Sequence, residues 1–511
     1  MNFYVTDSIN PQGENKRGVY LIKNSWDDWF KYRTTYSVWL SKLGEESDCG
    51  LTNIGAVKIG DIDDSKPFKT LPSEFTHLDD TFFSLGTDEA FYIELATTFS
   101  QYREEILVGL NDVALNETLY DKYRYNDVFH ESLARDISFT TIERRFNRLA
   151  NGNAELTNYK FSFEKKFENN SEVNLDFEVI QRQLPPTNVH CLIGRNGVGK
   201  SLLLTSMIES LINKNDEFEF YDEAEDYSSG FSNLLSINFS TFEKKKIYED
   251  NSNGADGIIY HHIGSQMYKE NESGKSELVN MTHDDLERLF VQSVTQCILR
   301  KPKRWTQCVN RLNTDPVFER IGVTQLIKNF RDSQEEEYKD QARKLFERLS
   351  SGHKIVLLSI CKLVELSEEK TLLIMDEPEM HLHPPLLSSF IRSVSYLLRM
   401  VNGVAIIATH SPIVLQEIPS SCIWRLDKIG EILKAERFSF PTFGENISTL
   451  TREVFGYEVS KSGFNNILES VVAHYSESSY KEIDDNIFRN ELGIEALNIL
   501  RILVSKREDE K

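Results

Sequence analysis

One short stretch constrains the fold of this chain more than any other. Residues 194–201 read Gly-Arg-Asn-Gly-Val-Gly-Lys-Ser, which fits the pattern G-x-x-x-x-G-K-[ST] in full. The apolar run Val189–Ile193 before it predicts a buried strand, and the run Leu202–Ile212 after it predicts a helix. Strand, glycine-rich loop and helix form a phosphate-binding unit, because backbone N–H groups and the positive helix N-terminus face the anion.

The residue types in this loop predict its ligands. Lys200 would reach the β- and γ-phosphates of ATP, and Ser201 would ligate Mg²⁺. We therefore expect ATP and Mg²⁺ as cofactors. The residues expected to bind the nucleotide are Gly194, Arg195, Asn196, Gly197, Val198, Gly199, Lys200 and Ser201.

Two later runs predict the catalytic end of the same sheet. Leu372–Met375 predicts a buried parallel strand that ends in two carboxylates, Asp376 and Glu377. Ligands bind at the carboxyl ends of such strands. Asp376 would hold Mg²⁺ through water, and Glu377 would orient or deprotonate the attacking water. The run Val404–Ala408 predicts a further buried strand, with His410 just beyond its end.

Composition and charge limit the partners. The chain has 511 residues, enough for two or three domains, and 58 Lys+Arg against 80 Asp+Glu give a net charge of −22. Such a chain is not a general nucleic-acid coat. Residues 300–305, Arg-Lys-Pro-Lys-Arg-Trp, form a dense basic cluster, which either contacts a phosphate backbone or is a solvated helix end.

The cysteines and the apolar runs indicate a compartment. The six cysteines form no C-x-x-C pair, which favours a reducing cytoplasm over a zinc module. No apolar run approaches the roughly 18 residues of a membrane span. We therefore expect a cytoplasmic protein that does not bind a membrane.

The order of these motifs resembles that of ABC-type ATPases. Between the P-loop and Asp376-Glu377 stands Leu349-Ser350-Ser351-Gly352, at the place of the ABC signature. The resemblance implies that Ser350, Ser351 and Gly352 cap the γ-phosphate bound by the opposite subunit. It also implies that Met380–Pro384 is the D-loop and that His410 is the switch histidine, which contacts the γ-phosphate and is catalytic together with Glu377. The alternatives are a helix start with a serine cap, and a metal site at His381 and His383.

The fold that this resemblance implies is α/β, with a mixed sheet, an antiparallel β lobe and a helical insertion, like an SMC-like head. In the β lobe, Tyr159 or Phe161 would stack on adenine or pack in the core. Ser240 and Thr241 stand where ABC ATPases usually carry a glutamine. The expected divisions are 1–150, an N-terminal α/β segment completing the head; 151–245, the β lobe and P-loop; 246–348, the helical insertion; 349–425, the signature, Walker B and switch region; and 426–511, a C-terminal helical tail.

Within the compact bacterial ABC/SMC-like ATPases, often labelled AAA-family, the chain resembles the PtuA family of Septu and some retron anti-phage systems. The residues that carry this likeness are L-S-S-G-x-K-I-V-L-L, D-E-P-E-x-x-L-H-P and T-H-S-P. The resemblance implies a homodimer or higher oligomer with composite ATP sites. It implies an HNH nuclease (PtuB) as partner and, in retrons, a reverse transcriptase with its msDNA.

Three other readings remain open. AriA of the PARIS system, a sensor ATPase, is a close rival of PtuA. An SMC-like DNA-repair ATPase that binds DNA is disfavoured because the insertion is short and lacks heptads. A transporter subunit is disfavoured by the D-E-P-E-M-H-L-H-P stretch and by the large N-terminal segment. The tail does not predict a TOPRIM nuclease.

Overall fold

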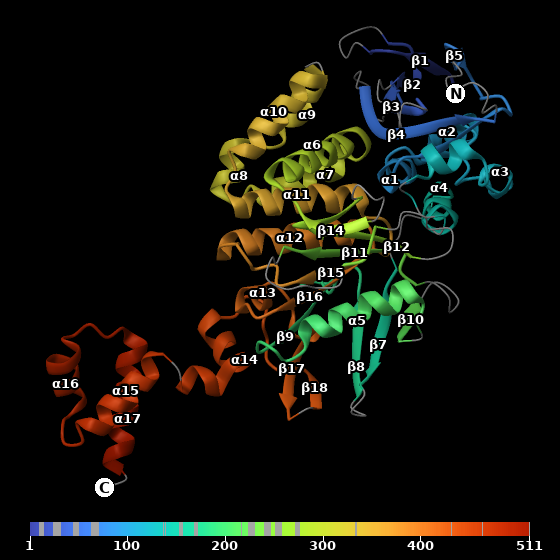
Figure 1. Cartoon of the computed structure of the whole chain (residues 1–511). Helices are drawn as coiled ribbons and strands as arrows, with labels where there is room; N and C mark the ends of the chain where they lie inside the picture. Colours follow the sequence, from blue (N-terminus) through green and yellow to red (C-terminus); the bar gives the residue numbers. More distant parts are fainter. Residues whose placement is uncertain are drawn as a thin grey trace.

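The chain is described by a computed structural model, apart from residues 10–14, 24–31, 44–50, 63–70, 136, 138, 140, 153–156, 168–171, 216, 223–229, 240–246, 251–257, 271–275, 333–334, 431, 462 and 510–511. The described part has a central body, an N-terminal lobe at the upper right of Figure 1 and a C-terminal helical tail at the lower left. Ser240 and Thr241 lie outside the described residues.

A seven-stranded sheet with the order β12-β11-β15-β16-β9-β17-β18 forms the centre of the body. Its strands pair in parallel except for the last, because β18 is antiparallel to β17. Three strands that the sequence predicted, β9, β15 and β16, are thereby confirmed. The strands are β9 (Val189–Gly194), β11 (Asn233–Asn238), β12 (Ile259–Gly264), β15 (Leu372–Asp376), β16 (Val404–Thr409), β17 (Ile423–Ile429) and β18 (Ile432–Arg437).

Both faces of this sheet are buried, and successive residues alternate between them. Leu192, Ile374 and Ile406 point to one face, where they pack with α5 (Lys200–Asn213) and the β lobe. Their neighbours Ile193, Met375 and Ile407 point to the other face, against a layer of helices. This double coverage explains why the strands are apolar throughout.

The layer of helices on the second face comes from two parts of the chain. A β-hairpin, β13 (Gln266–Glu270) and β14 (Ser276–Asn280), leads into the insertion. The expected insertion at 246–348 is too long at its start, because β12 inside that range belongs to the central sheet. The helices are α6 (His283–Arg300), α7 (Pro302–Leu312), α8 (Pro316–Ile321), α9 (Gln325–Asp332), α10 (Glu335–Glu347), α11 (Ser351–Leu366) and α12 (Pro384–Met400).

The β lobe is a three-stranded antiparallel sheet of β7 (Tyr159–Lys166), β8 (Glu172–Val179) and β10 (Phe218–Asp222). Tyr159 and Phe161 are each 1% exposed and stack in the core of this lobe. Neither ring is open to an adenine base, so the stacking hypothesis is wrong and core packing explains both residues.

The N-terminal lobe has a sheet and a core of its own. The sheet has the order β5-β1-β2-β3-β4-β6, and among the described residues none of its strands pairs with the central sheet. The segment 1–150 therefore packs beside the head instead of adding strands to it. The strands are β1 (Phe3–Thr6), β2 (Gly18–Lys23), β3 (Thr35–Ser41), β4 (Leu51–Asp61), β5 (Glu74–Phe75) and β6 (Phe82–Gly86).

Helices cover one side of this lobe. The spacing of apolar residues from Phe91 to Leu110 would suit one helix, but the chain turns at Phe99 (φ −121°, ψ 32°), whose ring joins the core, and two helices form instead. The helical segments are α1 (Glu89–Thr97), α2 (Ser100–Gly109), α3 (Glu117–Tyr123) and α4 (Asn147–Ala150), with single π turns at Phe129–Leu133 and Thr141–Phe146.

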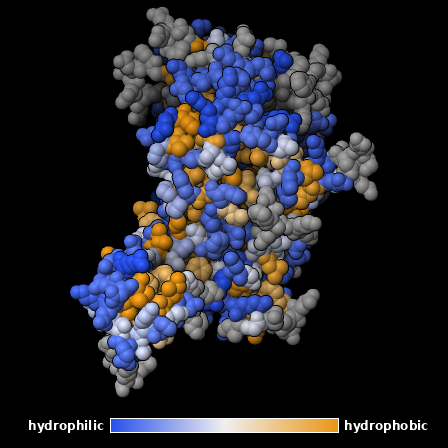
Figure 2. Space-filling view, turned by 60° about the vertical axis from the view of Figure 1, so that its left-hand side comes forward, coloured by the Kyte–Doolittle hydropathy of each residue, from blue (hydrophilic) through white to orange (hydrophobic). Residues whose placement is uncertain are grey.

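The C-terminal tail projects from the body beyond α14 (Ile447–Lys461), which packs against α13 (Pro412–Gln416), as Figure 1 shows. Its helices α15 (Phe464–His474), α16 (Tyr480–Ile483) and α17 (Ile494–Asp509) enclose a small separate core. Figure 2 shows apolar side chains gathered on this tail, which exposes Phe464, Ile467, Ile494 and Ile502. In the described part of the chain, every helix is too short or too polar to cross a bilayer.

Candidate functional site

The glycine-rich loop connects β9 to α5, as the sequence predicts. Gly199 stands at the N-cap of α5 with φ +114°, a left-handed conformation that favours glycine, and Gly197 has φ +75°. A side chain on Gly194 would collide with the carbonyl oxygen of Leu426 on β17. The glycines thus let the loop turn tightly over the sheet and aim α5 at the space above it.

Lys200 lies inside this loop with 5% of its surface exposed. Its Nζ donates to the carbonyl oxygens of Gly194, at 2.9 Å, and Arg195, at 3.1 Å. Burial lowers the pKa of the Lys200 ammonium, and the carboxylates of Glu377, Asp376 and Glu379 act in the opposite direction. The ammonium is therefore held under the loop and faces three carboxylates.

The register of the sheet places these carboxylates. Asp376 pairs with Ala408, and Thr409 pairs with Ile193, so the carboxyl ends of β15, β16 and β9 lie at one edge. With strands about 4.8 Å apart, Asp376 is roughly 10 Å from the P-loop strand. This spacing suits a Mg²⁺ ion on the phosphates of a nucleotide between Ser201 and Asp376.

Glu377 and His410 lie side by side beyond the strand ends. His410 Nδ1 is 3.7 Å from Glu377 Oε1 and 3.3 Å from Glu379 Oε1. Glu377 has φ +50°, and its N–H donates to the carbonyl of Ala408 at 2.8 Å. This turn aims the Glu377 side chain toward the histidine.

Glu379 is a site residue that the sequence reasoning missed. Its Oε1 accepts from the Thr409 hydroxyl at 2.6 Å and from the His410 N–H at 2.9 Å. Glu379 therefore fixes the backbone on which His410 stands. The sequence D-E-P-E could have indicated this residue, because Glu379 follows Glu377 by two positions and therefore lies on the same tight turn.

The Ser350–Gly352 stretch begins α11 and packs against the D-loop. Ser350 occupies the N-cap position, but its side chain makes no cap hydrogen bond, so the simple serine-cap reading is wrong. Its Oγ lies 2.6 Å from His353 Nδ1 instead. Ser351 is exposed, whereas Gly352 is buried, and a Cβ on Gly352 would lie 2.6 Å from the carbonyl oxygen of His381.

His353 joins this stretch to two other elements. Its Nε2 is 3.1 Å from Asp315 Oδ1 at the start of α8, and His383 Nε2 is 3.6 Å from Asp315 Oδ2. The possible ligand atoms of Asp315, His353 and His383 lie within 4.8 Å of one another. However, His383 Nδ1 accepts from the Leu386 N–H, so its proton is on Nε2 and no lone pair remains there for a metal.

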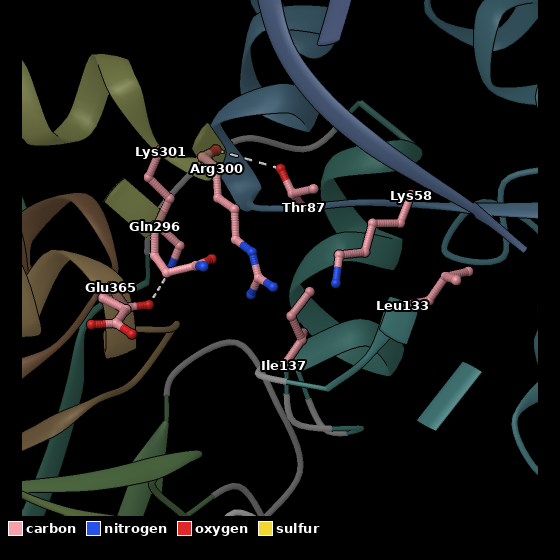
Figure 3. A pocket seen from close by; sticks show the side chains of 8 residues that line it. All are labelled: Lys58, Thr87, Leu133, Ile137, Gln296, Arg300, Lys301 and Glu365. Atoms are coloured by element: carbon pink, nitrogen blue, oxygen red, sulfur yellow. Dashed lines mark hydrogen bonds between the residues drawn. The ribbon is translucent and has the colours of Figure 1, made fainter. Parts of the chain in front are cut away.

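The basic cluster at 300–305 does not form an open basic face. Arg304 and Trp305 are almost fully buried, and Lys301 donates to the carbonyl oxygens of Glu365 and Ser367. Figure 3 shows Lys301 and Arg300 beside a small cavity between α6, α11 and the N-terminal lobe. The sequence left two interpretations of this cluster, a contact to a phosphate backbone and a solvated helix end. Both are wrong for Lys301, Arg304 and Trp305, which are buried.

Arg304 belongs to a buried ion network between the lobe and the head. Glu89 on α1 pairs with Arg304, at 2.7 Å, and with Arg145, at 3.4 Å. Arg145 also pairs with Glu369, at 3.3 Å, and Arg148 pairs with Glu369 at 2.9 Å. Glu369 lies three positions before Leu372, the first residue of the strand that carries Asp376. The N-terminal lobe is therefore anchored at the opposite end of β15 from the candidate site.

Comparisons with solved structures return ATP-binding cassettes. One, an ATP-binding cassette of an ABC transporter in its ADP conformation, is 17% identical, with 60% of this chain and 100% of that chain covered and a TM-score of 0.28. The second is cbiO1 of an ABC transporter from Clostridium perfringens, at 15% identity, 63% and 97% coverage and a TM-score of 0.28. The third is UvrA2 from Deinococcus radiodurans, at 12% identity, 56% and 38% coverage and a TM-score of 0.27.

Comparisons with families and curated proteins are more specific. Residues 208–416 match AAA_21, an AAA domain family described as a candidate AbiEii toxin of a type IV toxin–antitoxin system. Over 518 aligned residues the chain is 33% identical to Protein ea59 of Escherichia phage lambda, with 97% of this chain and 96% of ea59 covered. The chain is thus an ATPase of the ABC-like P-loop type, and it belongs to the same family as Protein ea59 of phage lambda.

Proposed function

We propose that this ATPase works as a nucleotide-driven switch in which two copies close around two ATP molecules. Each site would take Lys200, Ser201, Asp376, Glu377 and His410 from one copy and Ser350, Ser351 and Gly352 from the other. Lys200 would neutralise phosphate charge, Ser201 and Asp376 would hold Mg²⁺, and Glu377 would accept a proton from water while Glu379 keeps His410 in place.

One observation carries the shared site. The P-loop helix α5 and the signature helix α11 pack on opposite faces of the central sheet. Ser350 and Ser351 are exposed at the start of α11, and their surroundings come from α8 and the D-loop. A helix N-terminus with exposed serines suits a phosphate, and a partner's nucleotide can supply it.

A complementation experiment tests this arrangement. Lys200→Ala should destroy one half of each site, and Ser351→Glu should destroy the other half by placing an anion against the phosphate. Ser351 is preferable to Gly352 because a side chain at Gly352 would strike the D-loop backbone. Each variant alone should hydrolyse no ATP, but a mixture should recover activity, since each mixed dimer contains one intact site. If the mixture stays inactive although mixed dimers form, each site belongs to a single chain.

We further propose that this switch controls a partner nuclease in the conflict between bacteria and phage. The support is the similarity to a phage protein over nearly the whole chain and the match to a family described by an AbiEii-type toxin. The tail suits a docking role, because it stands apart from the body and exposes apolar side chains. An HNH nuclease of the PtuB kind is the partner that the PtuA-like motifs suggest.

Phage challenge of bacteria that express the chain with its neighbouring genes tests this proposal. Protection by the wild type and its loss in Lys200→Ala would support an ATP-controlled defence role. Purified complexes would then separate the subfamilies: an HNH nuclease would support a PtuA-like role, and a reverse transcriptase with msDNA a retron. Protection without a nuclease partner would favour an AriA-like sensor, whereas equal phage growth in all strains would contradict the defence role.

A further inference from the structure

The contacts of His353 determine which of its two nitrogens carries the proton when the ring is neutral. Asp315 is 2% exposed, and its Oδ1 already accepts from the Val317 N–H at 2.8 Å. A carboxylate offers only lone pairs, so the His353 Nε2 at 3.1 Å from the same oxygen must carry a proton. In a neutral imidazole the other nitrogen, Nδ1, then has a lone pair.

This tautomer fixes the hydroxyl of Ser350. Since Nδ1 is an acceptor, Ser350 Oγ must donate its proton to it across 2.6 Å. The exposed side of Oγ then presents lone pairs only. A γ-phosphate is also rich in lone pairs, so the signature of the isolated chain is repulsive to the ligand that the composite site is meant to bind.

Protonation of His353 reverses this polarity. In the imidazolium both nitrogens donate, so Nδ1–H would donate to Ser350 Oγ and the Ser350 proton would be free to point at the phosphate. We propose that His353 is a positioning residue that takes up a proton when two copies close around ATP, and thereby turns Ser350 into a hydrogen-bond donor. The inference rests on the composite site proposed above.

The surroundings of His353 suit a group that changes charge on closure. In the part of the chain that the structure describes, the ionisable side chains in contact with His353 are Asp315 at the start of α8 and His383 at the start of α12, and the Phe318 ring packs edge-on at 5.2 Å. The Asp315 carboxylate would stabilise the imidazolium. The N-termini of α11 and α12 would oppose it, until the anionic phosphate of the partner's nucleotide arrives.

The experiment measures protons during closure. The Glu377→Gln chain, in which slow turnover preserves the closed state, is titrated with ATP by calorimetry in two buffers of different ionisation enthalpy, while light scattering reports dimer formation. In the proposed switch, His353 is neutral in the open chain and protonated in the closed dimer. We therefore expect uptake of close to one proton per composite site, beyond the uptake of the double variant Glu377→Gln/His353→Asn. The asparagine amide can donate to Ser350 but cannot titrate.

A pH series gives the second measurement. For the Glu377→Gln chain, the ATP concentration at half-closure should rise by up to about tenfold for each pH unit over which closure takes up one proton per site. With His353→Asn this dependence should vanish while ATP still binds, and with the exposed His474→Asn as control it should persist. Closure without proton uptake in the chain that retains His353 overturns this inference and leaves the composite site standing. No closure at any pH overturns both.

Discussion

Removing the charge of Glu89 should loosen the N-terminal lobe from the ATPase head. The side chains of Glu89, Arg145 and Arg304 are 4%, 1% and 2% exposed, so solvent cannot replace a lost partner. In Glu89→Gln the amide oxygen can still accept a hydrogen bond, but Arg304 loses the charge of its paired carboxylate, and Arg145 must rely on the carboxylate of Glu369. Breaking a buried pair from one side costs about 3–5 kcal/mol.

A second ion pair across the same boundary provides the control. Lys303 on α7 pairs with Glu94 on α1 at 3.1 Å, but the two side chains are 46% and 25% exposed. Lys303→Gln should therefore cost less than about 1 kcal/mol. Both substitutions disrupt an ion pair between the N-terminal lobe and the head, but only the pair of Glu89 is buried.

Urea unfolding followed by circular dichroism measures the difference. A loss of about 3–5 kcal/mol should move the first transition of Glu89→Gln by roughly 1–2 M, since the m-value increases with protein size and is about 3 kcal/mol/M for a large unit. The double variant Glu89→Met/Arg304→Met should be more stable than Glu89→Gln, because it leaves fewer unpaired charges. If Glu89→Gln and Lys303→Gln unfold at the same urea concentration, the network does not anchor the lobe.

Three further predictions concern the sheet and the candidate site. Burial lowers the pKa of His190 on β9 from 6.5 to about 3. Between these two pH values the unfolded chain binds a proton that the folded chain does not bind, so the folded chain loses stability as the pH falls. His190→Leu should remove about 2 kcal/mol of this loss between pH 7 and pH 5, which thermal unfolding at both pH values would measure. Glu379→Gln should lower ATP turnover roughly ten- to a hundredfold with ATP binding intact, because it weakens the support of His410, and unchanged turnover would exclude that role. Lys200→Ala should lose most ATP affinity by calorimetry, whereas Glu377→Gln should keep the affinity and lose turnover about 10²–10⁴-fold.

The catalytic edge of the sheet was predictable because each of its parts is local in sequence. Val189–Ile193 and Leu372–Met375 are apolar over their whole length, which is typical of strands buried on both faces. The residues that bear function follow directly after such strands. Topology then brings them together, since the carboxyl ends of parallel strands meet at one edge.

The contacts around the signature could not be predicted in the same way. Asp315 lies 38 positions before His353, on a separate helix, and no periodicity joins them. The same holds for Glu89 and Arg304, which are 215 positions apart. Such pairs form only when the helices that carry them pack together. A single sequence shows which residues are charged but not which of them will pair.

The basic cluster at residues 300–305 shows why charge density alone misleads. Arg300 ends α6, and Pro302 begins α7, so the cluster lies at a sharp corner between two helices. This corner packs against the N-terminal lobe, and the side chains of Trp305 and Arg304 are therefore buried. Arg304 can be buried because the Glu89 carboxylate on α1 supplies the opposite charge at 2.7 Å. In an acidic chain with 80 carboxylates, such partners are abundant, and a basic cluster is then as suited to internal docking as to nucleic acid.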